Sequence, residues 1–178
     1  MSIARGLARL GPVMQLAWLP QDFDAALRHW TQTMGVGPFF LMENIQLQDM
    51  RYRGAPTDAV FSLALAYWGE TQIELIRPEN EAPSIYSGEY AVRDRLHHVC
   101  VLVDDIAAAY AACTEHRAEI LVEGRVGDSG HVIYADPGGG PGSVVEILQT
   151  QPGTRELFTM IREAGIDWDG NEPLRKLG

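Results

Sequence analysis

The sequence predicts an α+β fold built from two tandem modules, each with a strand, a helix and three further strands. The first observation is the order of the expected elements, which runs strand, helix, strand, strand, strand twice along the 178 residues. The second is a shared spacing, because Gln15 lies seven residues before Asp22 and His97 lies seven residues before Asp104. An internal duplication constrains a fold more strongly than the propensity of any one segment.

The first module is expected to begin with a short apolar strand at residues 13–19, which ends at Pro20. Asp22 is a suitable N-cap for a helix at 23–34, whose apolar residues recur at helical spacing and which stops at Gly35. The other elements expected are an extended segment, a loop and a two-strand hairpin, at residues 36–47, 50–58, 59–68 and 71–77.

The second module repeats this order after a segment rich in Pro, Glu, Ser and Asn. Its expected strand, helix and three strands lie at residues 96–103, 105–116, 119–126, 131–135 and 143–149. A helix at 154–164 falls outside the repeat. The predicted division is a first module at 13–78, a linker at 79–94, a second module at 95–150, and a C-terminal helix and tail at 151–178.

The composition narrows the class of partner. The net charge is −10 and no cluster of Lys and Arg stands out, so a nucleic acid or an anionic membrane is not an expected partner. No apolar run approaches the ~20 residues of a membrane span. Cys100 and Cys113 fall in a predicted strand and helix and form no disulfide or thiol-metal motif, which predicts buried free thiols in the cytoplasm. A small molecule is the partner expected.

Two glutamates interrupt apolar strands near the module ends. Side chains alternate along a strand, so Glu74 shares a face with Ile76, and Glu146 shares a face with Val144 and Leu148. If these faces point inward, each carboxylate is desolvated at a cost of several kcal/mol unless it is paired or bound to a metal. The alternative is that both strands lie at an edge and turn their glutamates to solvent.

The repeat extends this pair to four positions. Residues 71–76 match residues 143–148, which equates Glu74 with Glu146, and the spacing to the helix start equates Gln15 with His97. Two half-open sheets related by a pseudo-two-fold axis would bring all four side chains together. Two carboxylates, an imidazole and an amide oxygen suit a divalent ion that keeps bound water better than a structural zinc. His98 lies on the opposite strand face and is assigned a structural role.

These residues carry a resemblance to a known family. The duplicated unit, with Leu96-His97-His98-Val99 before Val103-Asp104-Asp105-Ile106 and a final Val145-Glu146-Ile147-Leu148, resembles the vicinal oxygen chelate superfamily over about residues 13–149. That superfamily includes glyoxalase I, methylmalonyl-CoA epimerase, extradiol dioxygenases and bleomycin-resistance proteins. The resemblance implies that the sheets form a half-open barrel around a metal cleft. It places the metal ligands on the first and last strands of each module, at Gln15, Glu74, His97 and Glu146.

The resemblance points to two branches at once. The ligand set is similar to that of glyoxalase I, whereas the segments 95–98 and 71–74 are closer to methylmalonyl-CoA epimerase. The epimerases have His at the position of Gln15 and Gln at that of Glu74. They also have a further carboxylate base, which is missing here because its position falls near Ser62. Of the glyoxalase residues that bind glutathione, only Arg93 has a counterpart. The substrate therefore stays open among a thioester, a hemithioacetal and a 2-oxo compound.

The function implied is that of a metal-dependent lyase or isomerase. One divalent ion per site (Zn, Ni, Co or Mn in preference to Fe) would stabilise an enediolate formed when the carbon next to a carbonyl loses its proton. Glu146 is the first candidate for the base and Glu74 the second. Further candidates for substrate contact are Arg93, Tyr67 and Tyr134.

The resemblance also bears on the oligomeric state and on two alternative functions. The resemblance implies a homodimer. An extradiol dioxygenase would need two histidines and a carboxylate around ferrous iron, and Gln15 counts against it. A metal-free protein of the bleomycin-resistance kind, which sequesters a small molecule, would not need both Glu74 and Glu146 inside.

Overall fold

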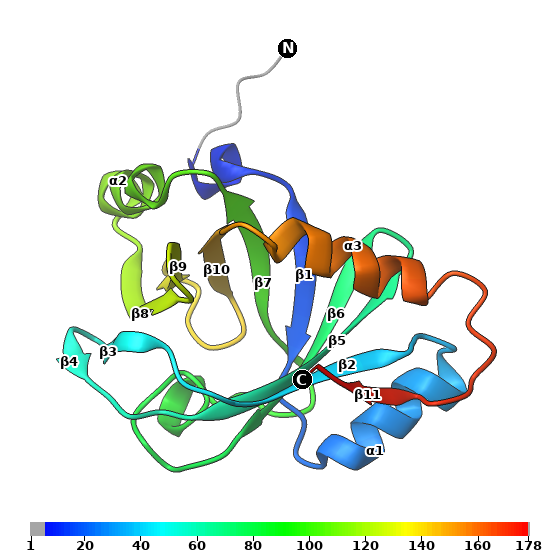
Figure 1. Cartoon of the computed structure of the whole chain (residues 1–178). Helices are drawn as coiled ribbons and strands as arrows, with labels where there is room; N and C mark the ends of the chain where they lie inside the picture. Colours follow the sequence, from blue (N-terminus) through cyan, green and yellow to red (C-terminus); the bar gives the residue numbers. More distant parts are fainter. Residues whose placement is uncertain (1–5, 178) are drawn as a thin grey trace.

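In the computed structural model, which describes residues 6–177, one open sheet of 11 strands forms the framework of the protein (Figure 1). The strand order is β11-β2-β5-β6-β1-β7-β10-β9-β8-β3-β4. The strands are β1 (Val13–Trp18), β2 (Phe39–Ile45), β3 (Gln48–Tyr52), β4 (Ala55–Pro56), β5 (Phe61–Trp68), β6 (Thr71–Pro78), β7 (Leu96–Val103), β8 (Glu119–Val126), β9 (Gly130–Asp136), β10 (Val144–Gln149) and β11 (Leu174–Lys176). The sheet does not close on itself, which confirms the predicted α+β class.

The helices cover separate parts of this sheet. They are α1 (Phe23–Arg28), α2 (Ile106–His116) and α3 (Thr154–Ala164), with short helical segments η1 (Gly6–Leu10), η2 (His29–Thr33) and η3 (Gly88–Tyr90). The Asp22 side chain caps α1 by accepting a hydrogen bond from the amide of Ala25, as the sequence predicts. Asp105, and not Asp104, caps α2, by accepting from the amide of Ala107.

The strand register shows which residues of the two halves are equivalent. β1 runs parallel to β6, and Glu74 lies opposite the residue two positions after Gln15. β7 runs parallel to β10, and Glu146 lies opposite the residue two positions after His98. The sheet therefore equates Gln15 with His98, one residue beyond the predicted His97.

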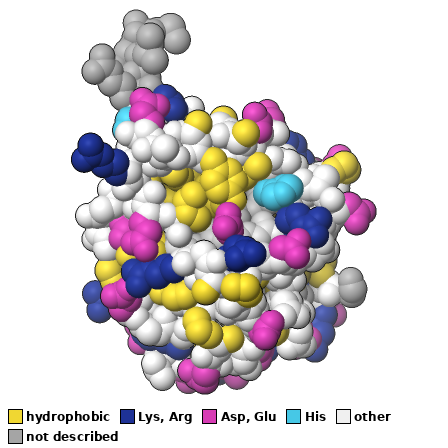
Figure 2. All heavy atoms as spheres, turned by 90° about the vertical axis from the view of Figure 1, so that its left-hand side faces the viewer, with side chains coloured by type: hydrophobic (Ala, Val, Ile, Leu, Met, Phe, Trp, Pro, Cys, Tyr) yellow, Lys and Arg dark blue, Asp and Glu magenta, His cyan; other side chains and the backbone are white. Residues whose placement is uncertain are grey.

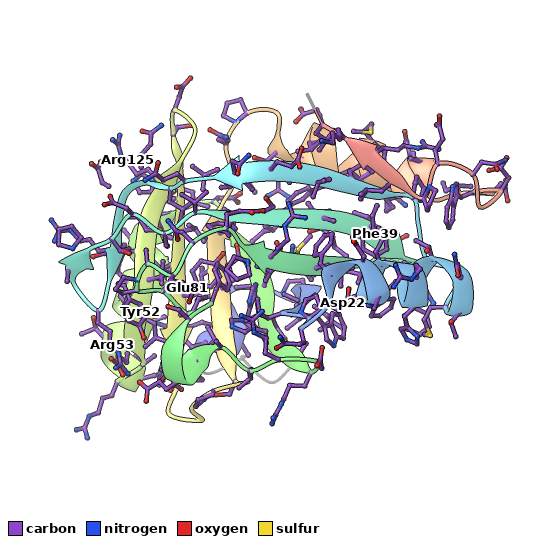
Figure 3. All side chains as sticks on the ribbon, turned by 90° about the horizontal axis from the view of Figure 1, so that it is seen from below. Asp22, Phe39, Tyr52, Arg53, Glu81 and Arg125 are labelled. Atoms are coloured by element: carbon purple, nitrogen blue, oxygen red, sulfur yellow. The ribbon has the colours of Figure 1, made fainter. Side chains whose placement is uncertain are left out.

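Two edge segments differ from the sequence-based expectation. Residues 50–58 were expected to be a loop, but β3 and β4 lie there, and β3 pairs with β8 in the second half of the chain. Figure 3 shows Tyr52 and Arg53 at this junction, where Arg53 forms ion pairs with Glu89 and Glu119. β11 pairs with β2 and has no counterpart among the expected strands. Distant partners stabilise both edges, so local sequence does not show them.

Apolar side chains of α1 and α2 pack against the face of the sheet opposite to that of Glu74 and Tyr134. Phe23 and Leu27 of α1 pack in one cluster with Ile73 and Leu75, and Ala109 of α2 packs in another with Ile133. Cys100 and Cys113 are buried and free, as predicted.

On the face drawn in Figure 2, acidic and basic side chains are interspersed. Within residues 6–177, no helix combines the length and the apolar character that a membrane crossing requires.

Candidate metal site

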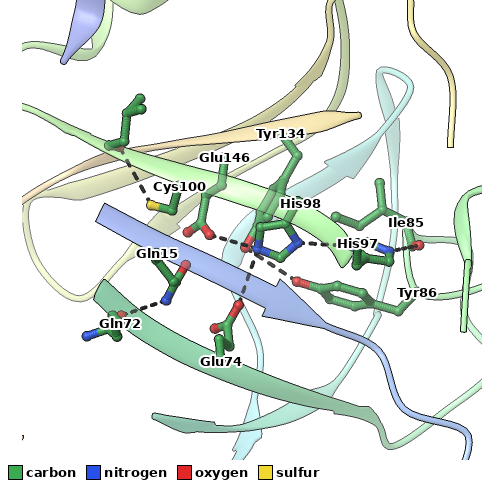
Figure 4. A network of polar contacts seen from close by, with 11 residues as sticks. Gln15, Gln72, Glu74, Ile85, Tyr86, His97, His98, Cys100, Tyr134 and Glu146 are labelled. Atoms are coloured by element: carbon green, nitrogen blue, oxygen red, sulfur yellow. Dashed lines mark hydrogen bonds and ion pairs between the residues drawn. The ribbon is translucent and has the colours of Figure 1, made fainter. Parts of the chain in front are cut away.

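Four polar side chains from the four central strands meet on the inner face of the sheet (Figure 4). His98 Nε2 of β7 lies 3.1 Å from Glu146 Oε2 of β10 and 3.2 Å from Glu74 Oε2 of β6. Gln15 of β1 lines the same cavity as both glutamates. All four residues are buried, and all come from one chain.

A relay of hydrogen bonds fixes the tautomer of His98. The carbonyl of Ile85 can only accept, so His97 Nε2, 3.0 Å away, carries a hydrogen and donates it. Burial, with a smaller effect from the charge of His98, lowers the pKa of His97 to about 3, so its ring is neutral and its Nδ1 can only accept. His98 Nδ1, at 2.9 Å, must then be the donor. His98 therefore turns Nε2 toward the two carboxylates.

A second chain of contacts orients the amide of Gln15. Gln72 Nε2 donates to the Tyr67 hydroxyl at 3.1 Å, which leaves Gln72 Oε1 to accept from Gln15 Nε2 at 2.6 Å. Gln15 Oε1 is consequently left buried with no hydrogen-bond partner among the described residues. An oriented and unpartnered amide oxygen is a suitable ligand for a hard cation.

Aromatic rings support the two histidines. Tyr134 lies edge-on to His98 with ring centroids 5.2 Å apart, and Tyr86 lies 5.5 Å from His97. The two tyrosine hydroxyls are 3.4 Å apart. Burial and the nearby glutamates raise the pKa of Tyr134 well above its usual value, so the hydroxyl is neutral.

The electrostatics of the group depend on His98. Burial alone would lower the pKa of His98, but the carboxylates of Glu146 and Glu74 more than offset this effect and raise it to about 9. Burial raises the pKa of Glu74, and the nearby His98 offsets this increase only in part. Without a cation, both His98 and Glu74 therefore bind a proton more readily than they would in water.

The donor set fits a divalent cation. The ligand atoms of Glu74, His98 and Glu146 lie within 4.8 Å of one another, and the unpartnered Gln15 oxygen faces the same cavity. Two carboxylates would neutralise one divalent ion, and a neutral imidazole can coordinate through Nε2. One nitrogen and three oxygens suit Zn, Ni, Co or Mn with water completing the shell.

The site opens into a cavity of about 250 Å³. Its polar lining consists of Gln15, Glu74, Tyr134, Glu146, Gln149, Gln151 and Thr154. Apolar side chains form most of the remaining wall, and they come from strands of both halves and from α3: Met42, Ile45, Leu47, Phe61, Leu63, Leu65, Val126, Val132, Leu148, Leu157 and Phe158.

Three residues lie differently from their sequence-based assignments. His97 was predicted to be the ligand and His98 to be structural, but β7 turns His98, and not His97, toward the two glutamates, so we propose that the roles are exchanged. Arg93 donates to the carbonyl of Pro20 and is not among the described residues that line the cavity. Tyr67 does not line it either, and acts through Gln72.

Four of the predicted site residues line the cavity, and their roles as ligands, base and substrate contact stay predictions. Gln15, Glu74, Glu146 and Tyr134 all lie at the cavity. The sequence reasoning missed Gln72 and Tyr86 as supporting residues. Gln72 could have been found, because it alternates with Glu74 on the same strand and so shares its face.

With the fold and the site in view, comparison with known proteins identifies the class. Residues 14–135 match the family described as the Glyoxalase/Bleomycin resistance protein/Dioxygenase superfamily, and the chain belongs to this family. A comparison with curated proteins finds no match.

Solved structures share the fold at low sequence identity. Methylmalonyl-CoA epimerase from Mycobacterium tuberculosis is 15% identical, with a TM-score of 0.56 over 87% of this chain and 97% of that one. The Streptomyces coelicolor epimerase in complex with 2-nitronate-propionyl-CoA is 14% identical, with a TM-score of 0.54 over 80% and 96%. A hypothetical protein from Bacillus halodurans C-125 is 15% identical, with a TM-score of 0.55 over 79% and 94%.

Proposed function

We propose that this protein is a metal-dependent, glyoxalase-like lyase or isomerase that removes a proton from the carbon next to a carbonyl. The observation that carries the proposal is the convergence of Gln15, Glu74, His98 and Glu146 at one end of a mostly apolar cavity. Burying two carboxylates costs several kcal/mol unless they are paired or bound to a cation.

The residues divide between holding the cation and moving the proton. His98 Nε2, Gln15 Oε1 and Glu146 would hold the ion, which when bound would polarise the carbonyl and stabilise negative charge on two neighbouring oxygens. We assign the base to Glu74, with Glu146 as the alternative. Apart from His98 Nε2 at 3.2 Å, Glu74 Oε2 has no partner among the described residues, and burial raises the pKa of Glu74 above its ordinary value, as suits a general base.

The proposed substrate is a small molecule with a carbonyl and an adjacent oxygen, such as a thioester, a hemithioacetal or a 2-oxo compound. Tyr134 is the proposed neutral contact beside the reacting group. We further propose a cytoplasmic homodimer, since the family resemblance implies a dimer and the buried free thiols suit a reducing compartment.

A second candidate function rests on His98. Because its pKa is raised to about 9, a protonated His98 can balance one glutamate without any metal. The cavity would then sequester a small molecule, in the manner of a bleomycin-resistance protein. This candidate predicts ligand binding that does not change when a chelator is added.

Loss of a substrate proton to solvent tests the proposal directly. Metal-loaded protein in D₂O should exchange the proton next to the carbonyl in at least one member of a panel containing an acyl-CoA, a glutathione hemithioacetal and a 2-oxo acid, as followed by NMR. Glu74→Gln should slow this exchange by about 10²–10⁴-fold. Glu70→Gln is the matched control, because the Glu70 side chain is 85% exposed and pairs only with Arg162 among the described residues.

Two results of this experiment would contradict the proposed function. No exchange with any metal or panel member would contradict the proposal. Consumption of oxygen with ferrous iron and a catechol would support the dioxygenase in its place.

A further inference from the structure

We propose that α3 makes the cavity selective for an uncharged, apolar substituent next to the chelating oxygens, with Leu157 and Phe158 as the specificity-determining residues. This inference rests on the proposed function and names the substrate class of the same site. It excludes substrates that must place a carboxylate or a phosphate inside the cavity.

The size of the cavity limits what can occupy it. A cavity of about 150 Å³ lined by aliphatic and aromatic side chains can hold benzene. The present cavity measures about 250 Å³, which leaves room for one ring-sized or branched aliphatic group and the oxygens beside it. It is smaller than the ~300–1,000 Å³ of most ligand pockets, so the occupant is compact.

The charges of the cavity wall disfavour an anionic substituent. Among the described residues that line the cavity, none is lysine or arginine, whereas Glu74 and Glu146 are both present. An anionic substituent would lose its hydration, gain no counterion from the wall, and face two carboxylates. Burying an unpaired charge in this way costs several kcal/mol. A charged carrier group would have to remain outside.

The helix α3 lies outside the duplicated unit (Figure 1). Ile161 is fully buried and packs with Phe40 and Leu65, which fixes the helix to the sheet. Leu157 and Phe158 lie one turn earlier on the same helical face and reach the cavity. Either side chain can therefore be shortened while Ile161 still holds α3 in place.

The test uses hydroxamic acids, which supply two vicinal oxygens and carry a variable group. Zinc-loaded protein is titrated by calorimetry with benzohydroxamic, acetohydroxamic, pentanohydroxamic and succinomonohydroxamic acids. We expect the benzo compound to bind at least about tenfold more tightly than the aceto compound, because the phenyl ring buries more apolar area. Pentanohydroxamic acid should bind at least about tenfold more tightly than succinomonohydroxamic acid, which carries a carboxylate.

Variants of α3 assign the selectivity to named residues. Leu157→Ala and Phe158→Ala should each reduce the benzo-to-aceto ratio by about fivefold or more. Met160→Ala is the matched control on the same helix, because Met160 is 39% exposed and does not line the cavity. It should leave the ratio unchanged.

The outcomes separate this inference from the proposed function. Equal affinities across the series, or preference for the succino compound, would overturn the inference while leaving the metal site intact. If acetohydroxamic acid does not bind the zinc-loaded protein, the proposed function fails. The selectivity is then decided on chelator-treated protein by NMR, where benzamide binding above succinamate supports the apolar cavity and the reverse order overturns it.

Discussion

His97 and His98 are adjacent in sequence but serve different tasks at the site. His98 Nε2 faces the carboxylates, and His97 links the far side of the His98 ring to the carbonyl of Ile85. The relay leaves one nitrogen of His98 free for either a proton or a cation. Proton and cation therefore compete for the same lone pair.

This competition predicts proton release when metal binds. Because the pKa of His98 is raised to about 9, the imidazole is protonated between pH 6 and 8 and must lose its proton to coordinate. Zinc affinity should rise by about tenfold per pH unit in this range for each proton released. Calorimetry in buffers of different ionisation enthalpy counts these protons. Zinc binding that is independent of pH and releases no protons would contradict the assignment of His98 as a ligand.

His97 predicts a stability change in a different pH window. Its pKa is about 3 in the folded protein and about 6.5 in the unfolded chain, so the unfolded chain binds more protons between these values. Stability should fall as the pH is lowered from about 6.5, by up to about 1.4 kcal/mol per unit from this residue. His98 adds no slope there, because its raised pKa matters only between about 6.5 and 9.

Comparison with a variant isolates the contribution of His97. His97→Asn keeps an acceptor for His98 but cannot titrate, so urea denaturation between pH 4 and 6.5 should show a shallower loss of stability than in the wild type. Equal slopes in the two proteins would show that His97 is not buried in the neutral form.

The exchange of His97 for His98 shows where sequence reasoning reached its limit at this scale. Strand alternation and the duplication alone predicted four ligand positions. Of these, Gln15, Glu74 and Glu146 line the cavity, and their binding of a metal stays a prediction. His97 was chosen because either Asp104 or Asp105 can cap the next helix. Asp105 is the cap, and counting seven residues back from it reaches His98.

At the scale of elements, the loop after β9 is held in place by one carboxylate. Asp136 Oδ1 accepts hydrogen bonds from the amides of Gly138, Gly139 and Gly140 at 2.7–3.1 Å, and Asp136 Oδ2 accepts from the hydroxyl of Tyr90 at 2.7 Å. Burial opposes ionisation, but these bonds more than offset it and lower the pKa of Asp136. The glycine-rich loop is thus an ordered turn that joins β9 to β10.

Removal of this carboxylate should loosen the loop that leads into the strand of Glu146. Asp136→Ala should lower the free energy of unfolding by about 2–3 kcal/mol, because the buried Tyr90 hydroxyl and three amides of the loop lose a charged acceptor. Hydrogen exchange at the amides of 138–140 should accelerate. Asp104→Asn is the control, since Asp104 is 91% exposed and its pair with Arg155 is worth less than about 1 kcal/mol. Unchanged exchange in Asp136→Ala would contradict this role.

The segment between the halves contributes more than a connection. The linker expected at 79–94 supplies the Ile85 carbonyl to His97, and buries Tyr86 and Tyr90. We retain modules at 13–78 and 95–150 as a proposal for how the chain divides. The pairing of β3 with β8 joins the two halves at the edge of the sheet, and such long-range pairing leaves no local signal in the sequence.

At the scale of the whole molecule, the open sheet explains why four distant residues form one site. The two parallel pairs, β1 with β6 and β7 with β10, lie side by side through the antiparallel β1–β7 contact. The duplication therefore places one ligand pair from each half at the centre of the sheet. The C-terminal helix α3, which the duplication does not contain, then contributes to the wall of the cavity above them.

The most direct test of the account is the metal content per chain, measured by mass spectrometry on protein purified without an affinity metal column. The account predicts close to one Zn, Ni, Co or Mn per wild-type chain, and loss of the metal in His98→Gln. His97→Asn should retain the metal with about 10–100-fold weaker affinity, as expected of a residue that orients a ligand. Wild-type protein that binds no divalent metal even after reconstitution, or a His98→Gln variant that binds it as well as the wild type, would contradict the central claim.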